Sequence, residues 1–87
     1  MICYILYNRN TPGERQVADL AKRLEREDVE TDLLDADSPR GVQFAESYDL
    51  MARPAAILIK NDGAPLQSWQ GEDQMPSPSD VGYLAHQ

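Results

Sequence analysis

Residues 53–70 read RPAAILIKNDGAPLQSWQ and predict a β-hairpin preceded by a proline. The apolar run AAILIK, Ala55 to Lys60, predicts a strand. Asn61-Asp62-Gly63 is a tight-turn signal, because Gly63 can adopt a positive φ without steric cost. A fourth strand is expected from Leu66 to Gln70. Pro65 at its start predicts an edge position, because proline donates no hydrogen bond to a neighbouring strand.

The chain before this hairpin predicts a strand, a helix and another strand. Ile2 to Tyr7 is nearly continuously apolar, which is typical of a strand buried on both faces of an α/β sheet. The helix that follows should bury residues spaced i, i+3, i+4 and i+7, namely Val17, Leu20, Ala21 and Leu24. It is expected to end near Glu27 or Asp28, and Thr31 to Asp35 predicts the next strand.

Two shorter helices complete the pattern. Ser38-Pro39 predicts a helix start, because serine is a good N-cap and proline suits the first helical position. The expected buried stripe of this helix consists of Val42, Ala45, Tyr48 and Met51. Ser79 is expected to cap a last helix with Val81, Tyr83 and Leu84. The order βαβαββα predicts an α/β fold in one domain, residues 1–87, with a right-handed parallel crossover before an antiparallel hairpin.

Composition and charge argue against several classes of function. The 87 residues include 15 acidic and 8 basic ones, and a net charge of −7 disfavours binding to nucleic acid or to anionic membranes. The longest apolar run, Met1 to Tyr7, is far shorter than the ~20 residues that span a bilayer. With no secretory signal visible, a cytoplasmic location is expected. Cys3 is the only cysteine, which excludes an intramolecular disulfide and a multi-cysteine metal site.

Two long stretches resemble a known family. LLDAD, followed by FAESYDLMARPAAILIKNDGAPLQSWQGE, looks like the second half of a thioredoxin, with an acidic strand end, a proline before an apolar strand and a K-x-D-G hairpin. ILYNRNTPGERQVADLAKRL is similar to the opening strand, active-site loop and first helix of a glutaredoxin. The chain therefore resembles the thioredoxin-like superfamily in its minimal, glutaredoxin-like form. This resemblance implies a four-stranded mixed sheet flanked by helices.

The same resemblance places Thr11-Pro12-Gly13-Glu14 where the family carries Cys-x-x-Cys. In the family, a helix N-terminus stabilises a reactive thiolate, and a second cysteine resolves the mixed disulfide. A threonine hydroxyl ionises far less readily and forms no disulfide. Cys3 should lie ~13 Å from the helix start and is expected to be a buried, small apolar side chain. Thiol–disulfide oxidoreductase activity is therefore not expected.

A structural role also accounts for these four residues. Thr11 as N-cap, Pro12 at the first helical position and Glu14 at the third predict a capping box. In that arrangement the Thr11 hydroxyl accepts from the N–H of Glu14, and the Glu14 carboxylate accepts from the N–H of Thr11. The alternative is that some of these residues contact a ligand.

The resemblance further implies that Pro54 is cis and lies beside Thr11 and Pro12. In the family, the residue before this proline pairs its backbone with an extended peptide or with glutathione. That residue is Arg53 here, and with Arg9 and Arg15 nearby it would place positive charge beside a helix N-terminus. Such an arrangement could hold a carboxylate. The alternative is that Arg53 pairs with Glu14 or another surface carboxylate.

The leading hypothesis is a redox-inactive binding or adaptor module for a protein or peptide partner. It would use this groove or the exposed edge of the fourth strand, where Trp69 either anchors a partner or covers the underside of the sheet. The alternatives are a glutathione-binding or glutathione-dependent enzyme, in which Thr11 orients the bound thiol, and a divergent thiol–disulfide oxidoreductase. No metal is expected, and glutathione is the one cofactor considered. The hypothetical ligand-binding residues are Arg9, Thr11, Pro12, Glu14, Arg53 and Pro54.

Overall fold

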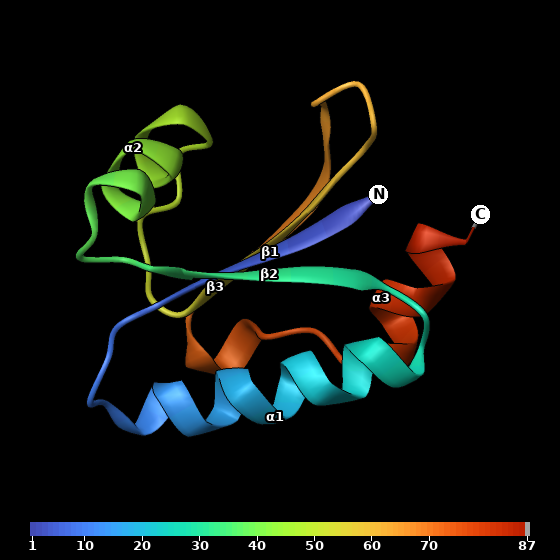
Figure 1. Cartoon of the computed structure of the whole chain (residues 1–87), viewed down its shortest axis with the longest axis horizontal. Coiled ribbons are helices and arrows are strands. Elements are labelled where there is room, and N and C mark those ends of the chain that lie inside the picture. Colours follow the sequence, from blue (N-terminus) through green and yellow to red (C-terminus); the bar gives the residue numbers. More distant parts are fainter. Residues whose placement is uncertain (87) are drawn as a thin grey trace.

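The secondary structure follows the expected βαβαββα order (Figure 1), in a computed structural model that describes residues 1–86. The short 3-10 helix η1 joins the last strand to the last helix. The elements are β1 (Ile2–Tyr7), α1 (Pro12–Arg26), β2 (Glu30–Asp35), α2 (Pro39–Ser47), β3 (Ala55–Ile59), β4 (Pro65–Gln70), η1 (Glu72–Gln74) and α3 (Pro78–Ala85).

The four strands form one mixed sheet in the order β2-β1-β3-β4. β1 pairs with β2 in parallel, whereas β1–β3 and β3–β4 are antiparallel. The turn between β3 and β4 is tight, as predicted: the N–H of Gly63 donates to the carbonyl of Lys60 at 2.9 Å, and Gly63 has φ 89°. β4 lies at the edge of the sheet, which agrees with the position of Pro65.

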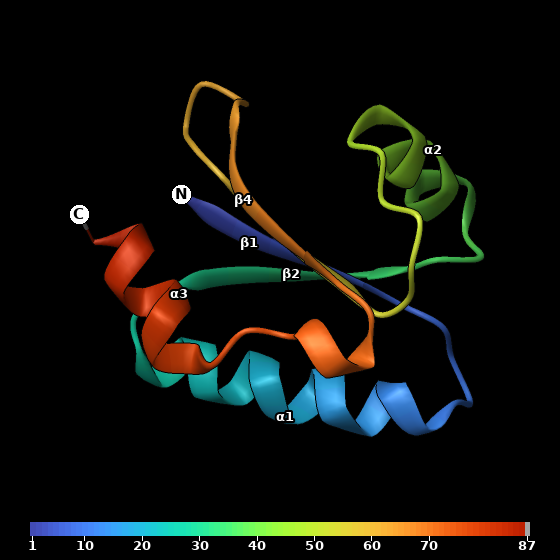
Figure 2. The same ribbon diagram turned by 180° about the vertical axis from the view of Figure 1, so that it is seen from behind.

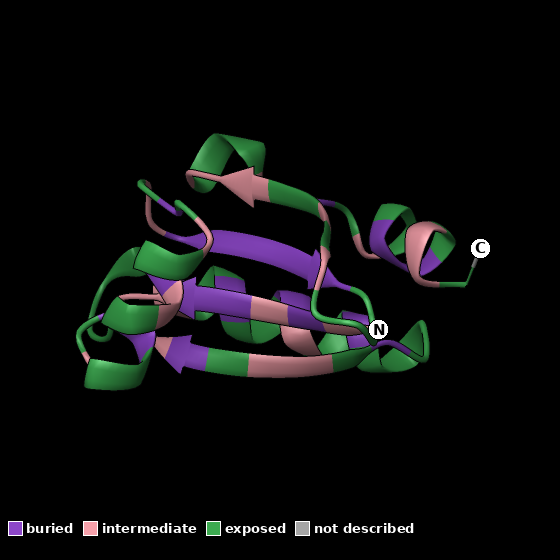
Figure 3. Cartoon of the chain, turned by 90° about the horizontal axis from the view of Figure 1, so that it is seen from above, coloured by how far each residue is buried: buried purple, intermediate pink, exposed green. Residues whose placement is uncertain are grey.

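Helices cover the two faces of the sheet unequally. α1 and α3 lie against one face, while α2 alone lies on the other (Figures 1 and 2). β3 runs between β1 and β4, and all five of its residues are buried, as Figure 3 shows for the purple strand inside the sheet. Burial on both faces explains why the sequence of β3 is apolar without alternation. No helix within residues 1–86 has the length and hydropathy needed to cross a membrane.

Each face of the sheet has its own apolar core, because successive side chains of a strand point to opposite faces. The core under α1 and α3 is built from Cys3, Ile5, Val17, Leu20, Leu24, Val29, Ala56, Leu58 and Val81. The core under α2 is built from Leu6, Leu34, Ala36, Ala45, Leu50, Ala55, Ile57 and Ile59. Trp69 is half-buried and packs against the first core, so it helps to cover the face of the sheet on which α1 and α3 lie.

The expected buried stripe of α2 is wrong in part. Ala45 is buried, but Val42 is 45% exposed and Met51 is 86% exposed. The helix ends at Ser47, so Met51 lies in the loop beyond it and cannot extend a helical stripe. Tyr48 of the expected stripe is half-buried and packs against the core, as does Phe44, which was not expected, and Gly41 is also buried. The rings of Tyr4, Phe44 and Tyr48 lie in a row, tilted by 43–44°, with neighbouring centroids 4.8–4.9 Å apart.

The start of α3 also differs from the prediction. The N-cap is Ser77 rather than Ser79, and its hydroxyl accepts from the N–H of Asp80 at 3.2 Å. Pro78 therefore occupies the first helical position, where its missing N–H leaves no hydrogen bond unmade. Val81 is fully buried as expected, whereas Tyr83 is 69% exposed.

Candidate ligand groove

α1 begins with a turn that is only partly the expected capping box. Thr11 is the N-cap with an extended backbone, but its hydroxyl donates to the carbonyl of Asn8 at 2.7 Å and accepts no backbone N–H. The Glu14 carboxylate does reach back, but to the N–H of Asn10 at 2.9 Å rather than to that of Thr11. Asn10 has φ 59°, in the left-handed region, and it is this tight turn before the helix that presents the N–H to Glu14.

The turn before α1 forms one wall of the site, and the loop before β3 forms the other. The Arg53–Pro54 peptide bond is cis. The carbonyl of Pro54 accepts from the N–H of Gly71 at 2.8 Å, and the side-chain oxygen of Gln70 accepts from the N–H of Met51 at 2.8 Å. The end of β4 therefore holds this loop from Met51 to Pro54.

These two walls meet at Gly13. A Cβ added to Gly13 would lie 3.6 Å from Cδ of Pro54 and 3.8 Å from a carboxylate oxygen of Glu72, so the three residues are packed together. In Figure 1 the loop before α1, the loop after α2 and η1 all lie toward the left end of the molecule. A groove of about 330 Å³ opens there, lined by Tyr7, Asn8, Thr11, Pro12, Gly13, Arg53, Pro54 and Glu72.

Four of the six residues expected to form the site line this groove: Thr11, Pro12, Arg53 and Pro54. Arg9 and Glu14 do not. Arg9 turns toward the end of β2, where its Nε lies 3.3 Å from a carboxylate oxygen of Asp35, and Glu14 is engaged with Asn10. Of the lining residues that the sequence did not single out, Asn8 and Gly13 could have been found by their nearness to Thr11. Glu72 had no such signal.

The groove carries less net positive charge than the sequence suggested, because Arg9 lies outside it and Glu72 lines it. The guanidinium of Arg53 donates to the carbonyls of Leu50 at 2.8 Å and Ala52 at 3.0 Å. The alternative of an ion pair between Arg53 and Glu14 or another carboxylate is wrong for the described residues, whose ion pairs are Arg9–Asp35 and Arg40–Asp32. Arg53 thus stabilises the conformation of its own loop, and Glu72 places a negative charge in the groove.

The geometry has a counterpart among solved structures. Thioredoxin 1 from the thermophilic eubacterium Thermosipho africanus TCF52B superposes with a TM-score of 0.72 over 99% of this chain and 91% of that chain, at 10% sequence identity. The chain has a thioredoxin fold. No protein-family model matches the chain, and no curated protein matches its sequence. At this identity the likeness concerns the fold alone, so the chemistry has to be argued from the residues.

In this thioredoxin fold, no thiol lines the groove. Cys3 is fully buried in the first core, and burial raises the pKa of its thiol from 9.0 to about 12. A thiol that is neutral and inaccessible neither attacks a disulfide nor binds a metal. Among residues 1–86 there is also no group of three His, Cys, Asp or Glu side chains placed to hold a metal ion.

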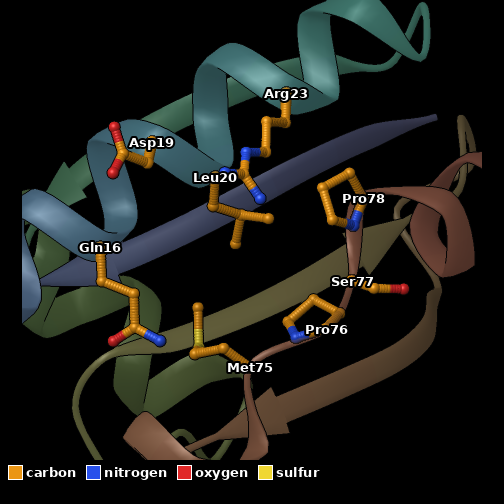
Figure 4. Close-up of a pocket in the computed structure, with 8 residues that line it drawn as sticks. All are labelled: Gln16, Asp19, Leu20, Arg23, Met75, Pro76, Ser77 and Pro78. Atoms are coloured by element: carbon orange, nitrogen blue, oxygen red, sulfur yellow. The ribbon is translucent and has the colours of Figure 1, made fainter.

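A larger hollow of about 420 Å³ lies elsewhere, between α1 and the segment that leads into α3 (Figure 4). Leu20 and Met75 face each other across it, and both belong to the first core or pack against it. Its polar lining comes from the outer surface of α1, with Asp19 and Arg23 one turn apart. This hollow lies between two elements that pack together, and it contains neither the start of α1 nor the cis-proline loop.

Proposed function

We propose that this chain is a redox-inactive binding module whose groove between Thr11 and Pro54 takes an extended segment of a protein partner. The observation that carries the proposal is the lining of that groove, which combines a helix start with a cis-proline loop and contains no sulfur. Thr11 and Glu14 stand where the resembled family would carry its two cysteines. The scaffold of a redox site is retained without a group that can exchange a disulfide.

The backbone of Arg53 supplies the second support. The registers of β3 with both β1 and β4 begin at Ala55, so Arg53 lies outside the sheet. Within residues 1–86 its backbone N–H and carbonyl have no hydrogen-bond partner. Free backbone groups at the end of a strand pair readily with an extended peptide, which gains affinity from main-chain hydrogen bonds. The groove beside Arg53 gives such a peptide room for its side chains.

A glutathione-dependent activity is the alternative, and the contacts of Thr11 weigh against it. A hydroxyl has one proton, and that of Thr11 is donated to the carbonyl of Asn8 at 2.7 Å. To stabilise a bound thiolate, Thr11 would have to give up this bond. Arg9 is paired with Asp35, which leaves less positive charge for the carboxylates of glutathione. A divergent oxidoreductase is disfavoured for a different reason, because no thiol lines the groove and Cys3 is buried.

Peptides selected from a random library on the immobilised protein test the proposal. Titrated into ¹⁵N-labelled protein, they are expected to shift the amide signals of residues 11, 13 and 53. The proposal is wrong if selected peptides move other residues only, such as those around Asp19 and Ser77 beside the larger hollow. Glutathione is titrated in parallel, and saturable shifts at Thr11 and Gly13 with glutathione alone would favour the enzymatic alternative.

A further inference from the structure

We infer that the partner segment carries an apolar side chain flanked by basic residues, and that the apolar side chain enters a second pocket next to the groove. This inference rests on the proposed function and names the partner's chemistry. The second pocket, called the Val42–Met51 pocket below, has a volume of about 340 Å³. It is lined by Val42, Ala45, Glu46, Asp49, Leu50, Met51 and Arg53.

Exposed apolar side chains gather at this pocket. Among residues 1–86 the large apolar side chains that stand exposed are Leu33, Val42, Met51 and Tyr83. Two of them, Val42 at 45% and Met51 at 86% exposure, line the same hollow. Isolated apolar residues on a surface need no explanation, whereas exposed apolar side chains that gather into one patch favour an interaction site. Methionine suits this role, because its flexible, polarizable side chain adapts to different partners.

The pocket and the groove adjoin at Arg53. Arg53 lines both, and its guanidinium is fixed by the carbonyls of Leu50 and Ala52, so it forms a wall shared by the two hollows. The backbone on the other side is also fixed, since the N–H groups of Met51 and Ala52 donate to Gln70. A peptide paired with the backbone of Arg53 would therefore direct alternate side chains into a preformed surface, which lowers the entropy lost on binding.

The charge around both hollows favours a basic partner. Glu46 and Asp49 line the Val42–Met51 pocket and Glu72 lines the groove. None of these three carboxylates belongs to an ion pair among the described residues. Arg53 is the one basic residue in the two linings, and its single positive charge is outnumbered by the three carboxylates. Lys or Arg side chains on the partner would therefore be attracted, and acidic segments repelled. This is the opposite of the carboxylate ligand that Arg9 and Arg53 suggested from the sequence.

The same charges argue against a second copy of this chain as the occupant. A symmetric dimer places identical surfaces against each other. Two copies meeting at this surface would bring six unpaired carboxylates together on chains that each carry a net charge of −7. The occupant that fits is a different protein, with an extended segment that presents one apolar side chain of leucine or methionine size between lysines or arginines.

Three synthetic nonapeptides of equal length test this inference by fluorescence anisotropy. The first has a central leucine flanked by lysines, the second a central leucine flanked by glutamates, and the third a central serine flanked by lysines. The first is expected to bind at least tenfold more tightly than the other two, and to lose affinity as salt is added. Equal affinity of the first and second peptides would overturn the inferred charge preference. Equal affinity of the first and third would overturn the apolar anchor.

Variants separate this inference from the proposed function. Met51→Ser and Val42→Ser are expected to weaken binding of the lysine–leucine peptide about tenfold, while Tyr83→Ser, whose exposure of 69% lies between theirs but which is on α3, leaves binding unchanged. These side chains are exposed, so the variants should fold, and circular dichroism checks this. If the peptide shifts the amide signals of residues 11, 13 and 53 but Met51→Ser leaves its affinity unchanged, the inference fails while the proposed function stands. If no peptide moves those amides, both fail.

Discussion

Cys3, the chain's only cysteine, lies in the first core with no exposed surface. In the folded chain the pKa of Cys3 is raised from 9.0 to about 12. Well below pH 9 the thiol is protonated in both the folded and unfolded chain, and its contribution to stability is complete. Between pH 9 and 12 the unfolded chain loses this proton while the folded chain keeps it, so stability falls as pH rises.

The prediction for Cys3 is therefore twofold. At pH 8 a thiol-specific reagent should label the native protein far more slowly than the protein unfolded in urea. The urea midpoint should also drop between pH 9 and 11, and drop by less in Cys3→Ala, which lacks the titrating group. Rapid labelling of native Cys3 would show that the thiol is accessible and would contradict its assignment as a core side chain.

For two glycines in the first turns of helices, the structure predicts opposite effects of substitution by alanine on stability. A Cβ at Gly41 would lie 1.9 Å from the carbonyl oxygen of Asp35, a clash with backbone, whereas a Cβ at Gly13 would lie at ordinary contact distance, 3.6 Å from Pro54. Gly41→Ala should destabilise the protein by about 1–3 kcal/mol, as overpacking does. Gly13→Ala should be neutral or stabilising, because alanine favours helix by up to about 1 kcal/mol. Urea unfolding of both variants measures this, and equal destabilisation would contradict the packing at both helix starts.

At the scale of elements, the start of α3 gives the sharpest prediction. The hydroxyl of Ser77 caps the helix by accepting from the N–H of Asp80, while Ser79 lies inside the first turn. Ser77→Ala should cost about 0.5–1 kcal/mol, and Ser79→Ala should cost little. Chemical denaturation of the two variants compares them directly. A larger loss of stability for Ser79→Ala would show that Ser79 is the N-cap, as the sequence predicted.

The sequence predicted the elements better than it predicted their contacts. Apolar runs located β1 and β3, since both strands are buried on two faces, and the i, i+3, i+4 pattern located α1. The stripe of α2 was misjudged in part, because the helix is only nine residues long, so that Met51 lies beyond it, and because Gly41 and Phe44 face the sheet whereas Val42 is exposed. A pattern of apolar residues in the sequence does not show where a short helix ends.

The candidate site was predictable in outline only. The resemblance brought Thr11 and Pro12 together with Pro54, which the structure also does. It did not show that Arg9 would turn to Asp35, or that Arg53 would donate to carbonyls of its own loop. Such choices depend on distances of a few ångströms in the folded chain, both between remote residues such as Arg9 and Asp35 and within the loop of Arg53. Glu72 entered the groove for the same reason, since only the folded chain brings η1 beside Gly13.

At the scale of the whole molecule, acidic charge is in large excess. The chain carries −7, and only two ion pairs form among residues 1–86. Repulsion between carboxylates should therefore destabilise the folded state at low ionic strength. Raising NaCl from ~0.02 to ~0.5 M, which shortens the screening length several-fold, is expected to raise the melting temperature by a few degrees. A fall in melting temperature over this range would show that attractive ion pairs outweigh the repulsion.

The central claim is that an alcohol and a carboxylate stand where a redox centre would need sulfur. The most direct test is reduction of insulin disulfides by the natural protein, by Thr11→Cys/Glu14→Cys, and by the control Ser77→Cys/Asp80→Cys. The control has the same N-cap spacing at the start of α3, a helix start that does not line the groove with Pro54. We predict no turnover by the natural protein or the control, and measurable turnover by Thr11→Cys/Glu14→Cys. Turnover by the natural protein would contradict the account.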